Sequence, residues 1–327
     1  MKLFVQAQID TLLQGALFLE AQPEVEPGTL TGLVSLREAL GSPGLNTLAE
    51  VNLDSSVGTG SEPVFEIVES MRAALDTLVS LTASGDMPLD QTLISAARDS
   101  VVDAHDSLAA KARLQLSESL RGIYVIVDPE ATRRRPVTDV AFQSLEGGAK
   151  VVQLRDKLND KGPMLETARE LKAICAEHDA LFVMNDHADL ARASNADILH
   201  VGQTDLPISE ARRILLPDQL IGNSNGTMDE LQRSQEDSVD YVAVGAIYAT
   251  TTMGKSGRTA LGPEMIKRAR ETVTQPIVAI GGINSSNIVD VAKAGAESVC
   301  VVSAITFADD PRVATEELVE LFESAKG

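Results

Sequence analysis

Acidic and basic side chains that suit phosphate and metal-ion chemistry follow short apolar runs in the second part of the chain. Asp186 and Asp205 come just after two successive runs, and carboxylates bind Mg²⁺ together with phosphate oxygens. Arg155 and Lys157 follow the preceding run and supply positive charge for a phosphate that shares this metal. The pattern predicts a metal-assisted phosphate subsite.

A second group of residues suits a phosphate held by the backbone. Gly281, Gly282 and Ser303 follow the last two apolar runs, where barrel enzymes commonly bind phosphate through N–H groups and a helix start. Two phosphate subsites at the same end of a barrel would fit transfer chemistry on phosphorylated small molecules.

Each of these residues also has a simpler explanation. Asn185 or Asp186 would cap the helix that follows, and Asp205 would cap the next one. Arg155 and Lys157 would be solvated loop charges. The Gly281-Gly282 pair would form only a tight turn. Because all of them follow strands that end on the same face, we favour a functional site.

These residues need a scaffold that gathers many strand ends. From Gly122 onward, eight short apolar runs alternate with amphipathic stretches of helical length, which is typical of parallel strands joined by helices. The eight repeats predict an α/β fold, a (β/α)₈ TIM barrel over residues 119–327, with a doubly wound open sheet as the alternative. The runs cover residues 123–127, 151–154, 181–184, 198–201, 220–221, 241–244, 277–280 and 299–302.

Residues 1–118 follow a different pattern. Apolar side chains recur at intervals of three and four residues over 4–17, 64–78 and 93–108, so we expect an all-α helical domain, a small bundle, before the barrel. Its role is open among a dimerisation or docking bundle, a regulatory module and the remnant of a fused enzyme. Three stripes exceed what a two-helix hairpin needs, which favours the first role and a homo-oligomer.

Composition limits the classes of partner. The 327 residues contain 28 Lys and Arg against 48 Asp and Glu, a net charge of −20, which argues against binding nucleic acid or an anionic membrane. Aromatic residues make up 3% with no Trp, so we expect aliphatic cores. Cys175 and Cys300 have no disulfide or zinc spacing, and no apolar run has the length of a membrane span. We expect a cytoplasmic protein.

Taken in order, seven segments resemble the thiamine-phosphate synthase (thiamine-phosphate pyrophosphorylase) family over about residues 121–310. The segments are QLRDK at 153–157, NDHADL at 185–190, HVGQTD at 200–205, GNS at 222–224, VGAIYATTT at 244–252, IVAIGGI at 277–283 and VS at 302–303. The resemblance implies a transferase that joins 4-amino-5-hydroxymethyl-2-methylpyrimidine diphosphate to a thiazole phosphate, or its carboxylated form. Thiamine phosphate forms and pyrophosphate is released.

The same resemblance implies roles for individual residues. Mg²⁺ would bind to Asp186 and Asp205, and the catalytic group would be Arg155, Lys157, Ser224 and Lys255. The pyrimidine diphosphate would be bound by Gln153, Leu154, Arg155, Asp156, Lys157, Asn185 and Ser224. The thiazole phosphate would be bound by Thr250, Thr251, Thr252, Gly282, Val302 and Ser303.

One position departs from the family pattern. Met253 stands where the family usually has a lysine, and Lys255 follows two residues later. We hypothesise that Lys255 supplies the missing charge; otherwise it is a solvated loop lysine and the site is weakened. Two other functions compete with the synthase: a related thiazole tautomerase, which needs no diphosphate-bound Mg²⁺, and a non-catalytic sensor of thiamine precursors, which only Met253 favours.

Overall fold

The computed structural model describes residues 2–20, 25, 28–39, 62–84, 90–252 and 259–326. The chain divides into two compact units, Met1–Ala112 and Arg113–Gly327. The division lies inside a helix that ends at Glu118. The predicted helical domain also ends at residue 118.

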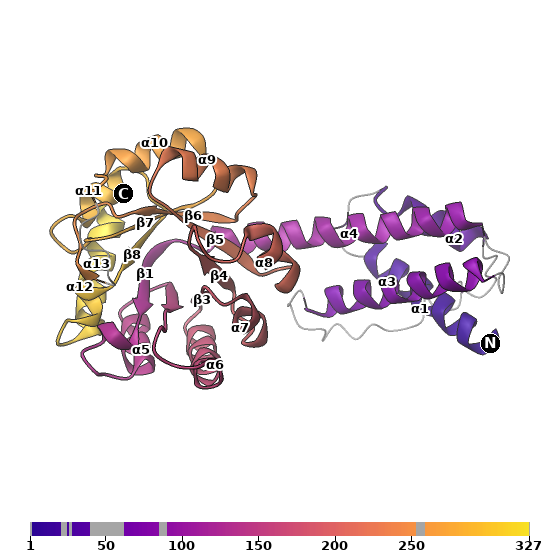
Figure 1. Cartoon of the computed structure of the whole chain (residues 1–327), viewed down its shortest axis with the longest axis horizontal. Helices are drawn as coiled ribbons and strands as arrows, with labels where there is room; N and C mark the ends of the chain where they lie inside the picture. Colours follow the sequence, from indigo (N-terminus) through magenta and orange to yellow (C-terminus); the bar gives the residue numbers. More distant parts are fainter. Residues whose placement is uncertain are drawn as a thin grey trace. The chain divides into compact units, whose positions relative to one another are not determined.

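The first unit is helical. Its elements are α1 (Lys2–Glu20), α2 (Thr31–Ala39), α3 (Glu62–Ala83) and most of α4 (Gln91–Glu118) (Figure 1). One core joins their apolar faces and contains the buried side chains of Leu12, Met71, Leu75 and Val101. The predicted helices before the barrel are confirmed.

Helix α2 is an addition to the three predicted stripes. A Cβ on Gly32 would lie 2.0 Å from the carbonyl oxygen of Ala96, so only glycine allows this approach of α2 to α4. At the same contact the Gly32 N–H donates to Oγ of Ser100 at 2.9 Å. Close backbone packing therefore holds a helix of only nine residues.

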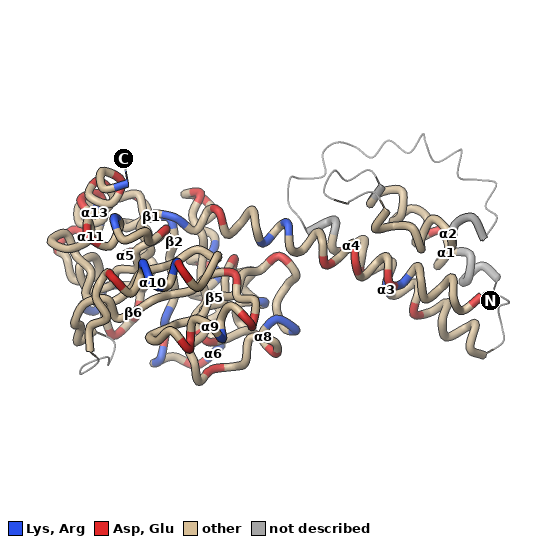
Figure 2. Tube along the Cα trace, turned by 90° about the horizontal axis from the view of Figure 1, so that it is seen from above, with Lys and Arg blue, Asp and Glu red and all other residues tan. Residues whose placement is uncertain are grey.

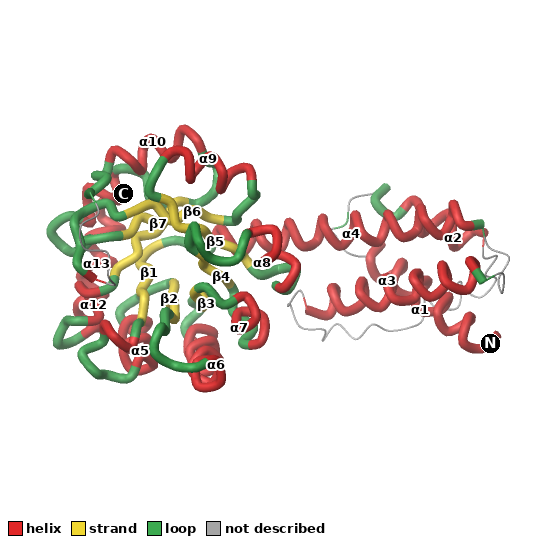
Figure 3. The backbone as a smooth tube through the Cα atoms, in the orientation of Figure 1, coloured by secondary structure: helices red, strands yellow, loops and turns green. Residues whose placement is uncertain are grey.

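The second unit is a closed parallel barrel in the order β1 to β8, with β8 paired back to β1 (Figure 3). The predicted barrel is confirmed, and the open sheet is wrong. The strands are β1 (Gly122–Val127), β2 (Val151–Leu154), β3 (Leu181–Asn185), β4 (Ile198–Val201), β5 (Leu220–Asn225), β6 (Tyr241–Gly245), β7 (Ile277–Ile280) and β8 (Ser298–Val301).

Helices follow the strands and carry charges of both signs (Figure 2). They are η2 (Pro129–Ala131), α5 (Val137–Glu146), α6 (Lys161–Glu177), α7 (Ala188–Ala193), α8 (Ile208–Ile214), α9 (Met228–Glu236), α10 (Glu264–Thr272), α11 (Ile288–Lys293), α12 (Ser303–Thr306) and α13 (Pro311–Lys326). Within the described ranges, no helix combines the length and apolar character that a membrane span requires.

Alternate residues of each strand face two different cores. Along β1, Ile123, Val125 and Val127 pack in the core shared with the helices, whereas Tyr124 and Ile126 lie in the barrel interior. Both cores are mainly aliphatic, as the composition predicts.

A repeated acidic clamp ties pairs of neighbouring strands together at their amino ends. Asp197, Asp240 and Glu297 each precede an even-numbered strand and accept a hydrogen bond from an N–H of the odd-numbered strand before it. Each acid also forms an ion pair with a cation on the helix before that odd-numbered strand. The pairs are Asp197 with Lys172, Asp240 with Arg212, and Glu297 with Arg270. The three clamps fix the stagger of three strand pairs.

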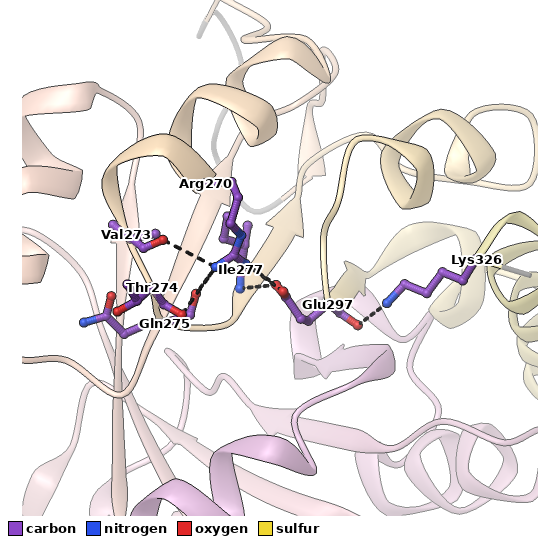
Figure 4. A network of polar contacts seen from close by, with 7 residues as sticks. All are labelled: Arg270, Val273, Thr274, Gln275, Ile277, Glu297 and Lys326. Carbon is purple, nitrogen blue, oxygen red and sulfur yellow. Dashed lines mark hydrogen bonds and ion pairs between the residues drawn. The ribbon is translucent and has the colours of Figure 1, made fainter.

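The clamp at β8 has the most contacts (Figure 4). Both carboxylate oxygens of Glu297 accept from Nη2 of Arg270, at 2.7 and 2.6 Å, and one also accepts from the Ile277 N–H at 2.7 Å. Arg270 Nη1 donates to the carbonyl of Gln275 at 3.1 Å, and Lys326 Nζ donates to the Glu297 carbonyl at 3.1 Å. This clamp joins α10, β7, β8 and α13.

We expect Glu297→Ala to lower the free energy of unfolding by about 1–3 kcal/mol, because it leaves the Arg270 guanidinium and a strand N–H without their acceptor. Denaturant titration followed by circular dichroism measures the change. The matched control is Glu316→Ala, which breaks an exposed pair with Arg312 and should cost much less than Glu297→Ala, because solvent screens such a pair. Equal losses in the two variants would contradict a special role for the clamp.

Candidate active site

The predicted polar residues lie where the strands end. In a parallel barrel all carboxyl ends meet at one rim, so segments far apart in the sequence converge there. Arg155 follows β2, Asp186 follows β3, and Asp205 lies four residues beyond the end of β4. Thr250 follows β6 by five residues, and Ser303 begins α12 after β8.

Arg155 is held by a buried carboxylate. Its Nη1 donates to Oδ2 of Asp128, which is 1% exposed and directly follows β1. The other carboxylate oxygen accepts the Glu130 N–H at 2.9 Å and caps η2. Sequence analysis missed Asp128, although an acidic residue directly after the first strand was the available signal.

Lys157 and Asp186 form a second ion pair at the rim. Asp186 has a left-handed backbone (φ 62°), and its N–H donates to the carbonyl of His200 at 2.8 Å. Helix α7 begins at Ala188, and its N-cap residue is His187 with no side-chain cap, so Asp186 does not cap α7. Its carboxylate instead meets the cation from β2.

Asp205 stabilises its own loop. Oδ2 accepts the Gly202 N–H at 2.7 Å, and α8 begins after Pro207 with no side-chain cap. Helix capping is therefore wrong for Asp205 as well.

Two carboxylates on neighbouring loops are an incomplete set of metal ligands. In the part of the chain that the structure describes, no three His, Cys, Asp or Glu residues group as a metal site. Mg²⁺ commonly takes one or two carboxylates and fills its remaining positions with water and substrate phosphate oxygens. Asp186 and Asp205 therefore fit Mg²⁺ that arrives with a phosphorylated ligand.

Asp156 lies between Arg155 and Lys157 in the sequence and stabilises the loop that follows β2. Its carboxylate is buried and accepts from the Leu158 N–H at 2.9 Å, the Asn159 N–H at 3.0 Å and Nδ2 of Asn159 at 2.7 Å. Burial alone would raise the pKa of Asp156, but these hydrogen bonds outweigh it and hold the pKa below its ordinary value.

The adjacent residues of β2 face opposite sides of the sheet. Gln153 is 2% exposed inside the barrel, where its amide donates to Tyr124 OH at 2.6 Å. Leu154 is fully buried in the core between strands and helices, so its side chain does not reach the rim. Asn185 and Ser224 are partly buried at the ends of β3 and β5.

A pocket lies at the ends of β6, β7 and β8. Its lining includes Thr250, Thr252, Gly282, Val302 and Ser303, and an adjoining pocket adds the exposed Thr251. Thr252 Oγ1 lies 3.4 Å from Ser303 Oγ. The predicted thiazole-phosphate residues are thus brought together.

Gly282 keeps this pocket open. Its backbone is left-handed (φ 65°), and a Cβ would lie 2.6 Å from the Ala249 carbonyl oxygen. Only glycine fits this position without displacing the loop after β6. Met253 and Lys255 lie outside the described residues.

We expect Asp156→Asn to lower the free energy of unfolding by about 1 kcal/mol at pH 7, because one of the three hydrogen bonds has no equivalent in the variant. The folded-state pKa lies below the unfolded value of about 3.9, so the carboxylate's stabilisation is present above that value and is lost as pH falls through the folded-state pKa. Urea unfolding of both proteins from pH 7 to pH 3 should show the difference shrinking below about pH 4. A constant difference would contradict this account.

The match to a known protein family lies in the second unit. The profile of the thiamine monophosphate synthase family (TMP-TENI) matches residues 123–305. A thiamine-phosphate synthase of Thermosynechococcus vestitus is 42% identical over 209 residues, which are 64% of this chain and 58% of that protein. The chain thus spans just over half the length of this relative.

Two further proteins bear on the division into units. A thiamine-phosphate synthase of Synechococcus sp. is 38% identical over 256 residues, 77% of this chain and 71% of that protein. This match is longer than the Arg113–Gly327 unit and so includes part of the helical unit. The structure of thiamine phosphate pyrophosphorylase from Pyrococcus furiosus has a TM-score of 0.59 and 34% identity, covering 65% of this chain and 100% of that one.

Proposed function

Since this chain belongs to the thiamine monophosphate synthase family, we propose that its barrel makes thiamine phosphate from the pyrimidine diphosphate and the thiazole phosphate, releasing pyrophosphate. The relatives confirm the predicted family, at about 40% identity over the barrel, and support the synthase function and the transferase class. The substrates and the residue roles that follow are proposals.

The observation that carries the proposal is the pairing of two cations with two carboxylates beside the end of β2. Arg155 is fixed by Asp128, and Lys157 meets Asp186. We assign the diphosphate to these two cations, since guanidinium and ammonium groups are the usual partners of phosphate oxygens. Gln153, Asn185 and Ser224 would bind the rest of the pyrimidine substrate.

Asp186 and Asp205 would hold Mg²⁺ on the diphosphate. The bound ion would neutralise negative charge that develops on the departing pyrophosphate. Before the reaction, Lys157 keeps the Asp186 carboxylate at the rim, where the ion would meet it.

The thiazole phosphate belongs on the other side of the rim. Thr250, Thr252, Gly282 and Ser303 line one pocket there, which would fix the phosphate and thereby orient the thiazole ring. Thr251 and Val302 border the same region. We assign Lys255 the charge that the family has at position 253.

The chemistry is a dissociative substitution at the pyrimidine methylene carbon. The bond from this carbon to the diphosphate oxygen breaks, and its electron pair leaves with pyrophosphate. The lone pair of the thiazole nitrogen then forms the carbon–nitrogen bond. Arg155 and Lys157 stabilise the leaving group, and no general base is needed because the attacking nitrogen carries no proton.

The remaining proposals concern the whole protein. We propose that the helical unit is a dimerisation or docking bundle. We also propose that the protein works in the cytoplasm, as its composition indicates. An unchanged oligomeric state after deletion of residues 1–112 would contradict a dimerisation role.

We expect the full-length protein to release pyrophosphate only when both substrates and Mg²⁺ are present, as measured by an enzyme-coupled pyrophosphate assay. Asp186→Asn should lower kcat/KM about a hundredfold, because it removes a metal ligand. Asp189→Asn is the matched control three residues further on, in the first turn of α7: Asp189 pairs with Lys161 at the surface, and kcat/KM should stay within about twofold.

The pyrophosphate assay also separates the competing functions. Pyrophosphate release without the thiazole phosphate would contradict the coupled transfer. Binding of the thiazole phosphate by calorimetry without any release would favour the tautomerase or the sensor.

A further inference from the structure

Five polar side chains form a continuous chain of contacts through the barrel interior. Gln153 Nε2 lies 2.6 Å from Tyr124 OH, and Tyr124 OH lies 3.4 Å from Tyr241 OH. Tyr241 OH lies 2.7 Å from Nδ1 of His200, and Nε2 of His200 lies 2.8 Å from Oγ of Ser224. The chain runs across β2, β1, β6, β4 and β5 and connects two residues assigned to the pyrimidine substrate.

The hydrogen atoms along the chain fit one direction, from Gln153 toward Ser224. The Gln153 amide nitrogen only donates, so the Tyr124 oxygen accepts and leaves its own hydrogen for Tyr241. The Tyr241 hydrogen is then available for Nδ1 of His200. A neutral imidazole that accepts at Nδ1 carries its proton on Nε2, so His200 donates to Ser224.

Burial keeps the two tyrosines in the state that this direction requires. Tyr124 and Tyr241 are at most 1% exposed, and burial raises the pKa of both phenols. Each therefore keeps one hydrogen to donate at neutral pH. The Tyr241 ring is also fixed in place: a Cβ on Gly222 would lie 1.9 Å from it, so the ring packs directly on the β5 backbone.

The Ser224 hydroxyl receives the last hydrogen bond and has its own hydrogen left to give. Among the described residues, His200 is the sole hydrogen-bond partner of its Oγ. Ser224 is partly exposed near the end of β5, on the side of the rim assigned to the pyrimidine diphosphate. Its O–H therefore remains available to an acceptor atom of a ligand.

We propose that Tyr241 and His200 are positioning residues that fix Ser224 as a hydrogen-bond donor to the pyrimidine diphosphate. The proposal rests on the function proposed above for Ser224. Neither residue touches the substrate in this account. Tyr241 selects the tautomer of His200, and His200 occupies the acceptor position of Ser224 so that the serine hydrogen points to the substrate.

Kinetics of a double-mutant cycle test whether Tyr241 acts through Ser224. We expect Ser224→Ala to lower kcat/KM for the pyrimidine diphosphate by about tenfold to a hundredfold, and Tyr241→Phe by about tenfold. The double variant should match Ser224→Ala within about twofold, because no serine hydrogen remains to be oriented. Multiplied losses in the double variant would overturn the proposal.

The tautomer of His200 gives a second readout that needs no activity. The chain has four histidines, and long-range ¹⁵N–¹H spectra at pH 8 distinguish Nε2–H from Nδ1–H, with the His200→Asn variant assigning the signal. We expect Nε2–H in the unmodified protein and a shift toward Nδ1–H in Tyr241→Phe. Tyr124→Phe is the matched control: it removes an equally buried hydroxyl but leaves the Tyr241–His200 bond, so the tautomer should stay the same.

The two readouts separate failure of this proposal from failure of the proposed function. An Nδ1–H tautomer in a protein that releases pyrophosphate would overturn the relay alone. Absence of pyrophosphate release from the unmodified protein would overturn the proposed function and, with it, the assignment of the serine hydrogen to this substrate.

Discussion

Closure of the eight parallel strands into a barrel decides where the side chains of the candidate site lie. When β8 pairs with β1, all eight strand ends meet at one rim, and side chains up to about half the chain apart become neighbours. The acidic clamps at the amino ends hold strands in register, and that register decides which residues reach the opposite rim. A shift of one residue along β2 would turn Leu154 into the barrel interior and Gln153 toward the helices.

The two ends of the barrel use ion pairs differently. At the amino end, Asp240 and Glu297 pair with cations and also accept strand N–H groups, so these pairs are part of the framework. At the carboxyl end, Lys157 and Asp186 are partly exposed and meet only through their side chains. In the proposed function this pair separates when Lys157 binds a phosphate and Asp186 a metal. This local arrangement would allow a protein of net charge −20 to bind anionic substrates.

Much of this site could be predicted from sequence because polar residues directly after apolar runs must lie at the rim of any closed parallel barrel. What could not be predicted is which side of a strand faces inward. All four residues of β2 are buried, because both faces of the strand are covered. The sequence therefore does not tell that Gln153 faces the interior and Leu154 the outer core. The contacts of Asp128, Tyr124 and His200 also escaped prediction, since each depends on a partner from a distant strand. Helix α2 was missed because backbone packing at Gly32, rather than a long apolar stripe, holds it in place.

In the proposed function, the two sides of one rim bind two different anions, with the metal on the β3–β4 side. A crystal structure of the full chain with thiamine phosphate, pyrophosphate and Mn²⁺, located by its anomalous scattering, tests this directly. We expect Mn²⁺ between Asp186 and Asp205, pyrophosphate on Arg155 and Lys157, and the phosphate of the product against Gly282 and Ser303. A metal bound away from both carboxylates, or both anions in the same pocket, would contradict it.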